Sequence, residues 1–184
     1  MSMQKAVFLD RDGTINVEKN YLFRIEDFEY LPGAKEGMKM LQDNGYKLII
    51  ITNQSGIARG YYTEEDYQRL NRWMINDLYD SGINISGTYY CPHHPEAKLD
   101  KYKCECKCRK PGISLFEKAI SEYSIDVMKS FAIGDKMRDL AICKSYQGIN
   151  GYLLYSEKCE ENDYGIMSIS GGILTAAKLI LEEE

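Results

Sequence analysis

A long apolar run is missing from this chain: no stretch of its 184 residues approaches the roughly 18 that a membrane-spanning helix requires, so we expect no membrane partner. Basic side chains are also in deficit, because 23 stand against 28 acidic ones and the formal net charge is -5. That balance argues against a nucleic-acid partner, which would need an overall basic face. The N-terminus reads Met-Ser-Met-Gln-Lys and then becomes apolar, leaving no room for a signal peptide. We therefore expect a soluble, cytoplasmic protein.

Internal repeats, long linkers and breaks in composition are absent as well. Hydrophobic residues make up 44% and charged residues 28% of the chain, which excludes a disordered or low-complexity protein and is enough for a sizeable core. A chain of this length is typical of one domain. We therefore expect a single domain over residues 1–184, and a monomer.

Six cysteines are present, and without an export signal they are expected to be reduced thiols rather than disulfides. Four of them crowd into residues 91–108, whereas Cys143 and Cys159 stand alone. Crowded thiols in a reducing compartment indicate a metal site, and an isolated thiol such as Cys143 indicates packing.

Apolar runs alternate with amphipathic segments along the chain, which predicts an α/β fold. Strands are expected at residues 5–10, 47–52, 87–91, 130–134 and 152–155, and helices at 34–44, 63–81, 113–123, 138–146 and 174–181. This order builds a parallel sheet with helices on both faces. No regular element is expected at 11–31 or 92–112. Because ligands of open α/β sheets bind beyond the carboxyl ends of the strands, these two stretches are expected to be functional.

The strongest chemical signal is Asp10-Arg11-Asp12-Gly13-Thr14, directly after the first expected strand. A single carboxylate here would be typical of a cap or a turn. Two carboxylates two residues apart repel one another at a sheet edge unless a cation or a shared proton compensates them. Mg²⁺ suits this place, because it prefers hard oxygen ligands and retains water and substrate phosphate.

Other polar residues fall at equivalent places in the chain. Thr52-Asn53 ends the second expected strand, Arg109-Lys110 precedes a helix, and Asp135, Lys136 and Asp139 follow the fourth strand. All should converge on one cleft at the carboxyl edge of the sheet. Together they supply a nucleophilic carboxylate, a second carboxylate for proton transfer, a hydroxyl and a cation, which are the parts of phosphoryl transfer through an aspartyl-phosphate.

Four motifs in this order, DRDGT, ITNQSGIARG, CRKPG and GDKMRDL, resemble those of the haloacid-dehalogenase (HAD) phosphatases. More narrowly, the chain resembles the D-glycero-D-manno-heptose-1,7-bisphosphate 7-phosphatases, and histidinol-phosphate phosphatases are close relatives. The resemblance spans roughly residues 7–154. It implies a Rossmannoid three-layer fold with a central parallel sheet, no large cap domain and a zinc-binding loop insert.

The resemblance also implies a role for each matching residue. Asp10 is the nucleophile, Asp12 the general acid and base, and Thr52 and Lys110 hold the phosphoryl oxygens. The implied Mg²⁺ ligands are Asp10, the backbone carbonyl of Asp12, and Asp135, with Asp139 supporting them. The implied substrate contacts are Glu18, Lys19, Asn20, Tyr21, Asn53, Gln54, Ser55, Arg109 and Lys136. Asn20 stands where relatives often carry Gly, and Asn tolerates a positive φ better than most residues.

A second cluster consists of Cys91-Pro92-His93-His94 and Cys104-Glu105-Cys106-Lys107-Cys108. Three thiols and an imidazole on one loop suit tetrahedral zinc. The family pattern points to Cys91, His93, Cys106 and Cys108 as ligands, which closes the site and makes zinc structural. Cys104 could replace Cys106. We expect the ion to order a loop, at about residues 91–110, that is too polar and Lys-rich to pack by itself.

The sequence thus predicts a Mg²⁺-dependent phosphatase that hydrolyses heptose 1,7-bisphosphate in nucleotide-activated heptose (lipopolysaccharide) biosynthesis. One alternative is histidinol-phosphate hydrolysis in histidine biosynthesis. Another is a non-catalytic phosphosugar-binding relative, which intact Asp10, Asp12, Lys110 and Asp135 argue against. A nucleic-acid 3′-phosphatase is disfavoured by the net charge of -5.

Overall fold

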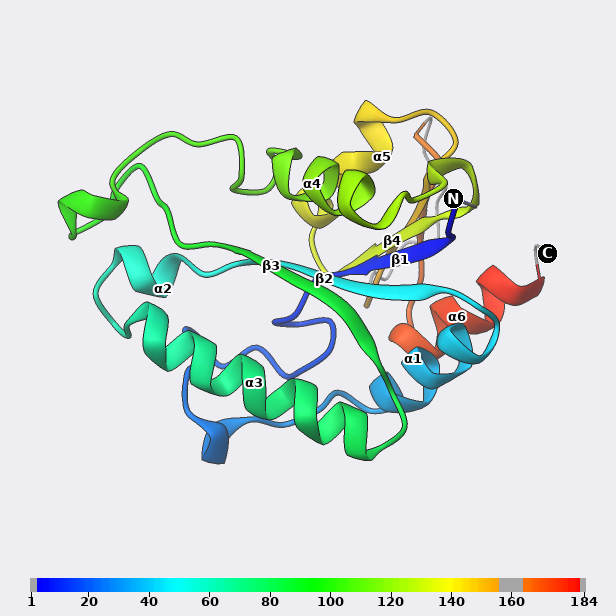
Figure 1. Ribbon diagram of the computed structural model, residues 1–184, viewed down its shortest axis with the longest axis horizontal. Coiled ribbons are helices and arrows are strands. Elements are labelled where there is room, and N and C mark those ends of the chain that lie inside the picture. Colours follow the sequence, from blue (N-terminus) through cyan, green and yellow to red (C-terminus); the bar gives the residue numbers. More distant parts are fainter. Residues whose placement is uncertain (1–2, 156–163, 183–184) are drawn as a thin grey trace.

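The computed structural model describes residues 3–155 and 164–182 and contains one six-stranded, all-parallel sheet (Figure 1). The order across the sheet is β3-β2-β1-β4-β5-β6. The strands are β1 (Ala6–Leu9), β2 (Lys47–Asn53), β3 (Ile85–Cys91), β4 (Phe131–Gly134), β5 (Asn150–Leu153) and β6 (Ile166–Ser168). The strand order reverses direction between β1 and β4, which is the place where open α/β sheets form a crevice for ligands.

Helices cover both faces of this sheet. They are α1 (Ala34–Asp43), α2 (Ser55–Ala58), α3 (Glu64–Asp80), α4 (Ser114–Tyr123), α5 (Ala141–Ser145) and α6 (Ile173–Glu182). Helices α1, α3 and α6 lie on one face and α4 and α5 on the other, while α2 lies at the carboxyl end of β2 (Figure 1). Four short 3-10 helices complete the described part: Ile25–Asp27, Asp100–Tyr102, Val127–Lys129 and Met137–Leu140.

The two faces of the central strands fill two hydrophobic cores. In β1, Val7 and Leu9 face the core under α1, α3 and α6, whereas Ala6 and Phe8 face the core under α4 and α5. Because both faces are covered, the strands are apolar throughout rather than alternating. Parallel-strand burial therefore explains the continuous apolar runs of the sequence, and buried Cys143 packs in the second core as predicted.

The predicted start of α3 is confirmed in atomic detail. Thr63 Oγ1 accepts a hydrogen bond from the Asp66 backbone N–H at 3.1 Å, and the Thr63 N–H donates to Asp66 Oδ2 at 2.9 Å. This capping box pairs backbone donors that the first helical turn would otherwise leave unsatisfied.

Several predicted elements differ from those observed. The strand expected at 152–155 lies at 150–153, and it is not the last, because β6 adds an edge strand. The segment 138–146 begins as the 3-10 helix Met137–Leu140 before α5. Cys159 lies outside the described residues. Within the described ranges, no helix combines the length and apolar character needed to cross a membrane.

Candidate active site

The floor of the site is a buried ion pair between Asp10 and Lys110. Asp10 follows β1, and its backbone N–H donates to the Ile133 carbonyl at 3.1 Å, which holds the residue at the junction of β1 and β4. Lys110 is only 2% exposed, and its Nζ donates to Asp10 Oδ1 at 2.6 Å, to the Ile51 carbonyl at 2.6 Å and to Asp139 Oδ1 at 2.8 Å. The ammonium therefore has three acceptors and points at the predicted nucleophile.

Burial is the main influence on the charge of this pair. It raises the pKa of Asp10 to about 6, although Lys110 acts in the opposite direction. Burial also acts to lower the pKa of Lys110, but the carboxylates of Asp10 and Asp139 outweigh it and the net shift is upward. Lys110 is thus held in its charged form, with a positive charge beside Asp10 where phosphoryl oxygens would gather.

Three carboxylates of the site meet the requirements of a hard divalent cation. One oxygen from each of Asp10, Asp135 and Asp139 lies within 4.8 Å of the others. Asp135 Oδ1 is buried and has no hydrogen-bond partner among the described residues, as a group reserved for an ion would be. Gly13 lies against this carboxylate, since a Cβ there would come 2.4 Å from Asp135 Oδ2. The donor set fits Mg²⁺.

Both carboxylate oxygens of Asp139 bind neighbouring residues. Its Oδ1 accepts from Lys110, and its Oδ2 accepts the backbone N–H of Lys136 at 3.0 Å. This arrangement suits the supporting position predicted for it.

The carboxylate of Asp12 is turned away from that cluster. Arg11, which is 1% exposed, donates from Nη2 to both of its oxygens at 2.8 and 2.9 Å, and Asn16 Nδ2 donates to Oδ1 at 3.1 Å. Gln54 Nε2 donates to Oδ2 at 2.9 Å. The Asp12 side chain is therefore positioned by three donors, while its backbone is left as the part that could reach the cation.

A polar pocket of about 360 Å³ has Asp12 and Gln54 in its lining. It brings together seven of the nine predicted substrate contacts: Glu18, Asn20, Tyr21, Asn53, Gln54, Ser55 and Arg109. The structure does not bring the other two to it. Lys19 pairs with Glu29 at 3.1 Å. Lys136 Nζ pairs with Asp135 at 3.0 Å, and it lies 3.9 Å from Oε2 of Glu18, which does line the pocket.

The loop that carries Glu18 to Tyr21 takes the strained conformation expected at Asn20. Asn20 has a φ of 49° and Tyr21 a φ of 69°. Asparagine adopts this left-handed region more readily than most residues, which explains how the chain can turn here without Gly. The turn places both residues on the pocket wall.

Asn53 also has a role in holding the backbone. Its Nδ2 donates to the Lys110 carbonyl at 3.1 Å and its Oδ1 accepts the Lys110 N–H at 3.0 Å. This pair of hydrogen bonds joins the end of β2 to the segment that delivers Lys110. Thr52, next to it, is buried at the floor of the site.

Sequence reasoning did not identify Tyr62, His94 and Arg138 as pocket residues. Arg138 joins Arg59 and Arg109, so three guanidinium groups line one pocket of an acidic protein. Burial lowers the pKa of Arg109, and the positive charges of Arg138 and Arg59 act in the same direction, although the Cys91 thiol opposes them. Arg138 belongs to the GDKMRDL motif, which follows the fourth expected strand. This position in the sequence was the one signal that could have placed Arg138 in the pocket.

The ring of His94 meets hydrogen-bond donors on both sides. Its Nδ1 accepts the Glu96 N–H at 3.0 Å, and its Nε2 lies 3.3 Å from Nη2 of Arg59. A neutral imidazole has one acceptor nitrogen, so Nε2 carries the hydrogen and faces a second donor. Burial, followed by the charges of Arg109 and Arg59, lowers the pKa of His94 and favours this neutral form. Two neighbouring donors suit an anionic group that accepts a hydrogen bond from each of them.

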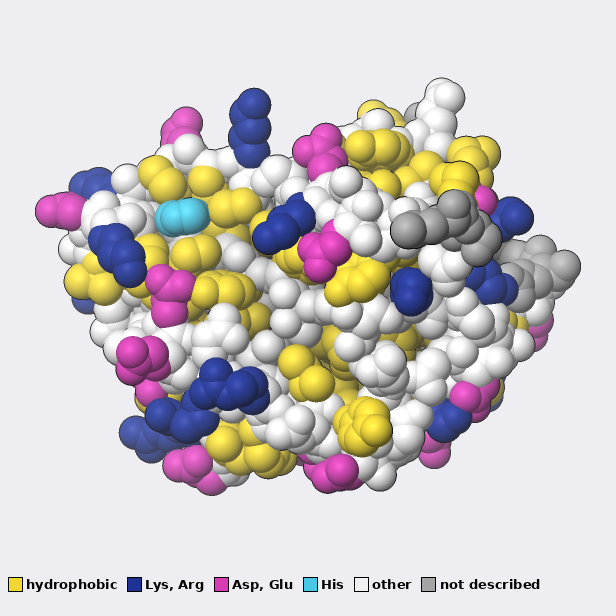
Figure 2. All heavy atoms as spheres, in the orientation of Figure 1, with side chains coloured by type: hydrophobic (Ala, Val, Ile, Leu, Met, Phe, Trp, Pro, Cys, Tyr) yellow, Lys and Arg dark blue, Asp and Glu magenta, His cyan; other side chains and the backbone are white. Residues whose placement is uncertain are grey.

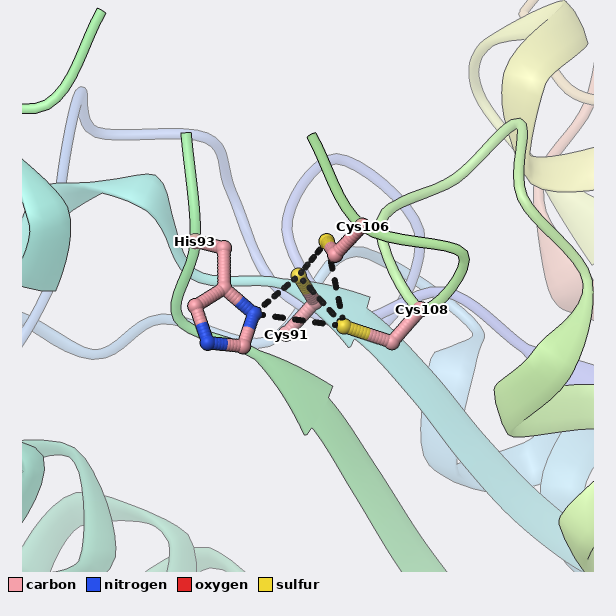
Figure 3. A group of neighbouring side chains, drawn as sticks. All are labelled: Cys91, His93, Cys106 and Cys108. Atoms are coloured by element: carbon pink, nitrogen blue, oxygen red, sulfur yellow. Dashed lines mark hydrogen bonds between the residues drawn. The ribbon is translucent and has the colours of Figure 1, made fainter. Parts of the chain in front are cut away.

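A Cys/His cluster stands beside the pocket (Figure 3). The Sγ atoms of Cys91, Cys106 and Cys108 lie 3.1–3.5 Å apart, and His93 Nδ1 is 3.7 Å from Cys91 and 3.4 Å from Cys108. These separations leave room for one ion with ligand bonds of about 2.0–2.3 Å. Cys104 is exposed and is not one of the four.

The loop of this cluster packs better than its sequence suggested. Ala97 and Tyr102 are buried against Ile57 and Ala58 of α2, in a third hydrophobic cluster. These two apolar side chains among the lysines attach the loop to α2, a contact that the sequence analysis did not predict. The same packing places His94 and Arg109 over the pocket.

Comparison with known proteins gives a consistent set of matches. A family model described as polynucleotide kinase 3 phosphatase matches residues 5–151. The D-glycero-beta-D-manno-heptose-1,7-bisphosphate 7-phosphatase of Haemophilus ducreyi is 48% identical over 138 residues, which cover 74% of this chain and 75% of that protein. The D-glycero-alpha-D-manno-heptose-1,7-bisphosphate 7-phosphatase of Photorhabdus laumondii is 49% identical over 136 residues, which cover 74% of each.

Among solved structures, the D,D-heptose 1,7-bisphosphate phosphatase from B. bronchiseptica, complexed with magnesium and phosphate, superimposes with a TM-score of 0.80. The two sequences are 24% identical, and the match covers 98% of this chain and 99% of the other. This likeness confirms the predicted three-layer fold around a parallel sheet.

Proposed function

This chain belongs to the family of HAD phosphatases that includes the D-glycero-D-manno-heptose-1,7-bisphosphate 7-phosphatases, and we propose that it hydrolyses heptose 1,7-bisphosphate at C7 with Mg²⁺. The chain is thus a phosphoric monoester hydrolase. The observation that carries the proposed substrate is the pocket, which is lined by Asp12 and by three arginines, Arg59, Arg109 and Arg138. The product, heptose 1-phosphate, would serve nucleotide-activated heptose biosynthesis.

The proposed reaction has two displacements at phosphorus. A carboxylate oxygen of Asp10 attacks the C7 phosphoryl group, the bond from phosphorus to the sugar oxygen breaks, and Asp12 gives a proton to the departing alkoxide. Asp12 then takes a proton from a water molecule, whose oxygen attacks the aspartyl-phosphate and releases phosphate and free Asp10. Lys110 and Thr52 hold the phosphoryl oxygens during both steps.

Magnesium fits the carboxylates of Asp10 and Asp135 together with the backbone carbonyl of Asp12. When bound, the ion would neutralise charge between the nucleophile and the phosphoryl group. Support comes from the unpartnered, buried Oδ1 of Asp135, and from the magnesium and phosphate named for the B. bronchiseptica structure. Without the ion, Asp10 and Asp135 would repel one another and an incoming phosphate.

The distal phosphate at C1 calls for a second cationic site. Arg59, Arg109 and Arg138 line the pocket, and the paired donors of Arg59 and His94 suit an anion. Histidinol phosphate carries an amine in place of this second phosphate, and three guanidinium groups would repel that amine. The charge of the pocket therefore favours a bisphosphate.

We expect a higher kcat/KM for D-glycero-D-manno-heptose 1,7-bisphosphate than for histidinol phosphate. Arg109→Ala should lower kcat/KM for the bisphosphate by roughly 10- to 100-fold, which is the effect of losing a charge-assisted hydrogen bond, with little effect on a small ester such as 4-nitrophenyl phosphate. Phosphate release measured over this panel tests both statements.

The matched control is Arg72→Ala, which removes an exposed arginine of α3 that does not line the pocket. This variant should behave like the unmodified protein. Equal or better turnover of histidinol phosphate by the unmodified protein would overturn the substrate assignment. Release of phosphate from a DNA 3′-phosphate end at a higher kcat/KM would place the chain with the polynucleotide phosphatases instead. Over the face drawn in Figure 2, acidic and basic side chains are interspersed without a continuous basic stripe, which favours the small substrate.

We also propose that Cys91, His93, Cys106 and Cys108 bind a structural zinc ion. All four positions are taken by protein ligands, which leaves no coordination site for water or substrate. Arg109 and Lys110 follow the last ligand directly, so the ion would order the segment that supplies both cations to the site.

Elemental analysis of protein purified without a His tag should find about one zinc ion per chain, from the four-ligand requirement. Cys108→Ser should lose the ion and lower the melting temperature, because binding of the ion stabilises the folded loop. The control is Cys104→Ser, an exposed thiol outside the four, which should keep both the ion and the stability. Zinc kept by the first variant and lost by the second would mean that Cys104 is the ligand.

A further inference from the structure

The side-chain amide of Gln54 is hydrogen-bonded within the protein through both its nitrogen and its oxygen. Gln54 is 2% exposed, and its Nε2 donates to Asp12 Oδ2 at 2.9 Å and to Thr52 Oγ1 at 2.9 Å. Its Oε1 accepts the Tyr62 hydroxyl at 2.5 Å. Both amide hydrogens are therefore in use, and the amide has little left to offer a substrate.

Asp12 determines which way round this amide lies, and Tyr62 then anchors it. A carboxylate can only accept hydrogen bonds, so Nε2 must face Asp12, and Oε1 is left to accept from the Tyr62 hydroxyl. In the opposite orientation an amide oxygen would lie against the Asp12 carboxylate, and the two would repel each other. The Tyr62 hydroxyl thus holds the far end of the amide that donates to Asp12.

The Tyr62 ring is itself held firmly. It is 6% exposed, and it stacks on Phe23 with ring centroids 5.4 Å apart. On another side it lies against Gly56 in α2, where a Cβ would come 2.1 Å from Cε1 of Tyr62. The hydroxyl has a defined position because the ring is packed between two segments of the chain.

Among the described residues, the hydrogen bond from Gln54 is the one that links the Asp12 carboxylate to a different segment of the chain. Asn16 donates to Oδ1 of Asp12, and Arg11 donates to both oxygens. Both donors belong to the same segment of the chain as Asp12. Gln54 is the one of the three donors that comes from the end of β2, the element that also carries Thr52. The amide thereby ties the carboxyl group of Asp12 to the wall of the site.

We propose that Tyr62 and Gln54 are positioning residues for Asp12: the Tyr62 hydroxyl anchors the Gln54 amide through its oxygen, and the amide holds the Asp12 carboxyl group in place for proton transfer to the leaving group. This inference rests on the proposed function, in which Asp12 is the general acid. It assigns a role to a tyrosine that touches neither the nucleophile nor the cation ligands in the described residues.

General-acid catalysis depends on the leaving group, and that dependence separates positioning from structural support. An alkoxide needs a proton as it departs, whereas 4-nitrophenolate leaves without one. The value of kcat/KM reports the steps up to transfer of the phosphoryl group to Asp10. Misplacing Asp12 should therefore lower kcat/KM for glycerol 2-phosphate and spare 4-nitrophenyl phosphate.

The experiment measures kcat/KM for these two esters in Mg²⁺ with Tyr62→Phe, which removes one hydroxyl. We expect about a tenfold loss with glycerol 2-phosphate, corresponding to one lost hydrogen bond, and a change within about twofold with 4-nitrophenyl phosphate. Gln54→Met, which removes both donors and keeps the length of the side chain, should show the same selectivity with a larger loss. The control is Tyr67→Phe, which loses a buried hydroxyl that has no hydrogen-bond partner among the described residues.

An equal loss with both esters, or no loss with either, in variants that retain the melting temperature would overturn the positioning role. Both probes are generic phosphate esters, so a wrong substrate assignment leaves the test unaffected. A failure of the heptose assignment would appear only in the comparison with histidinol phosphate.

Discussion

Asp10→Asn is expected to abolish turnover, lowering phosphate release by more than about a thousandfold, because a carboxamide cannot form the acyl-phosphate on which the proposed chemistry depends. The fold should survive, since Asn has the same shape and Lys110 keeps Asp139 and the Ile51 carbonyl as acceptors. Phosphate release in Mg²⁺ and the melting temperature measure the two effects separately. Substantial activity in a folded Asp10→Asn protein would remove the covalent mechanism.

Lys110→Met is expected to have the second-largest effect, a loss of roughly 10²- to 10³-fold in kcat, by analogy with removing one donor from an oxyanion site. The substitution keeps the length of the side chain and removes the charge that faces Asp10 at 2.6 Å and Asp139 at 2.8 Å. Two buried carboxylates would then be left without their cation, so the melting temperature in the absence of Mg²⁺ should fall as well.

The matched control for Lys110→Met is Lys107→Met, which removes an exposed lysine from the same loop. This variant should keep both activity and stability. If Lys110→Met retained normal kcat, the ammonium would be a structural ion pair and not a partner of the phosphoryl group.

The central part of the fold could be predicted because its signals are local. The runs 5–10 and 47–52 are buried on both faces, so their apolar character shows in the sequence itself. The edge strand β6 was missed because Ile166–Ser168 is short and ends in Ser, and only pairing with β5 makes it a strand. The positions of Asp10 and Asp135 could be predicted in the same way. Each belongs to a motif at the end of a strand, and the carboxyl ends of parallel strands lie at one edge of the sheet.

Side-chain direction explains what the sequence could not predict of the site. Gln54 was predicted as a substrate contact from its motif, but its amide donates to Asp12 and accepts the hydroxyl of Tyr62, whose ring packs between Phe23 and Gly56. His94 reaches the pocket because Tyr102 and Ala97 attach the loop to α2. Lys19 was also predicted as a substrate contact, but its side chain pairs with Glu29 instead. Each outcome depends on contacts between residues that are not neighbours in the sequence, and a linear motif does not reveal such contacts.

The covalent role of Asp10 is tested most directly by the stereochemical course at phosphorus. A substrate whose transferred phosphoryl group is made chiral with sulfur and oxygen isotopes would be hydrolysed in isotopically labelled water, and the configuration of the released thiophosphate determined. Each in-line displacement inverts the phosphorus centre, so two displacements through Asp10 predict overall retention. Overall inversion would mean that water attacks the substrate directly, and it would contradict the account.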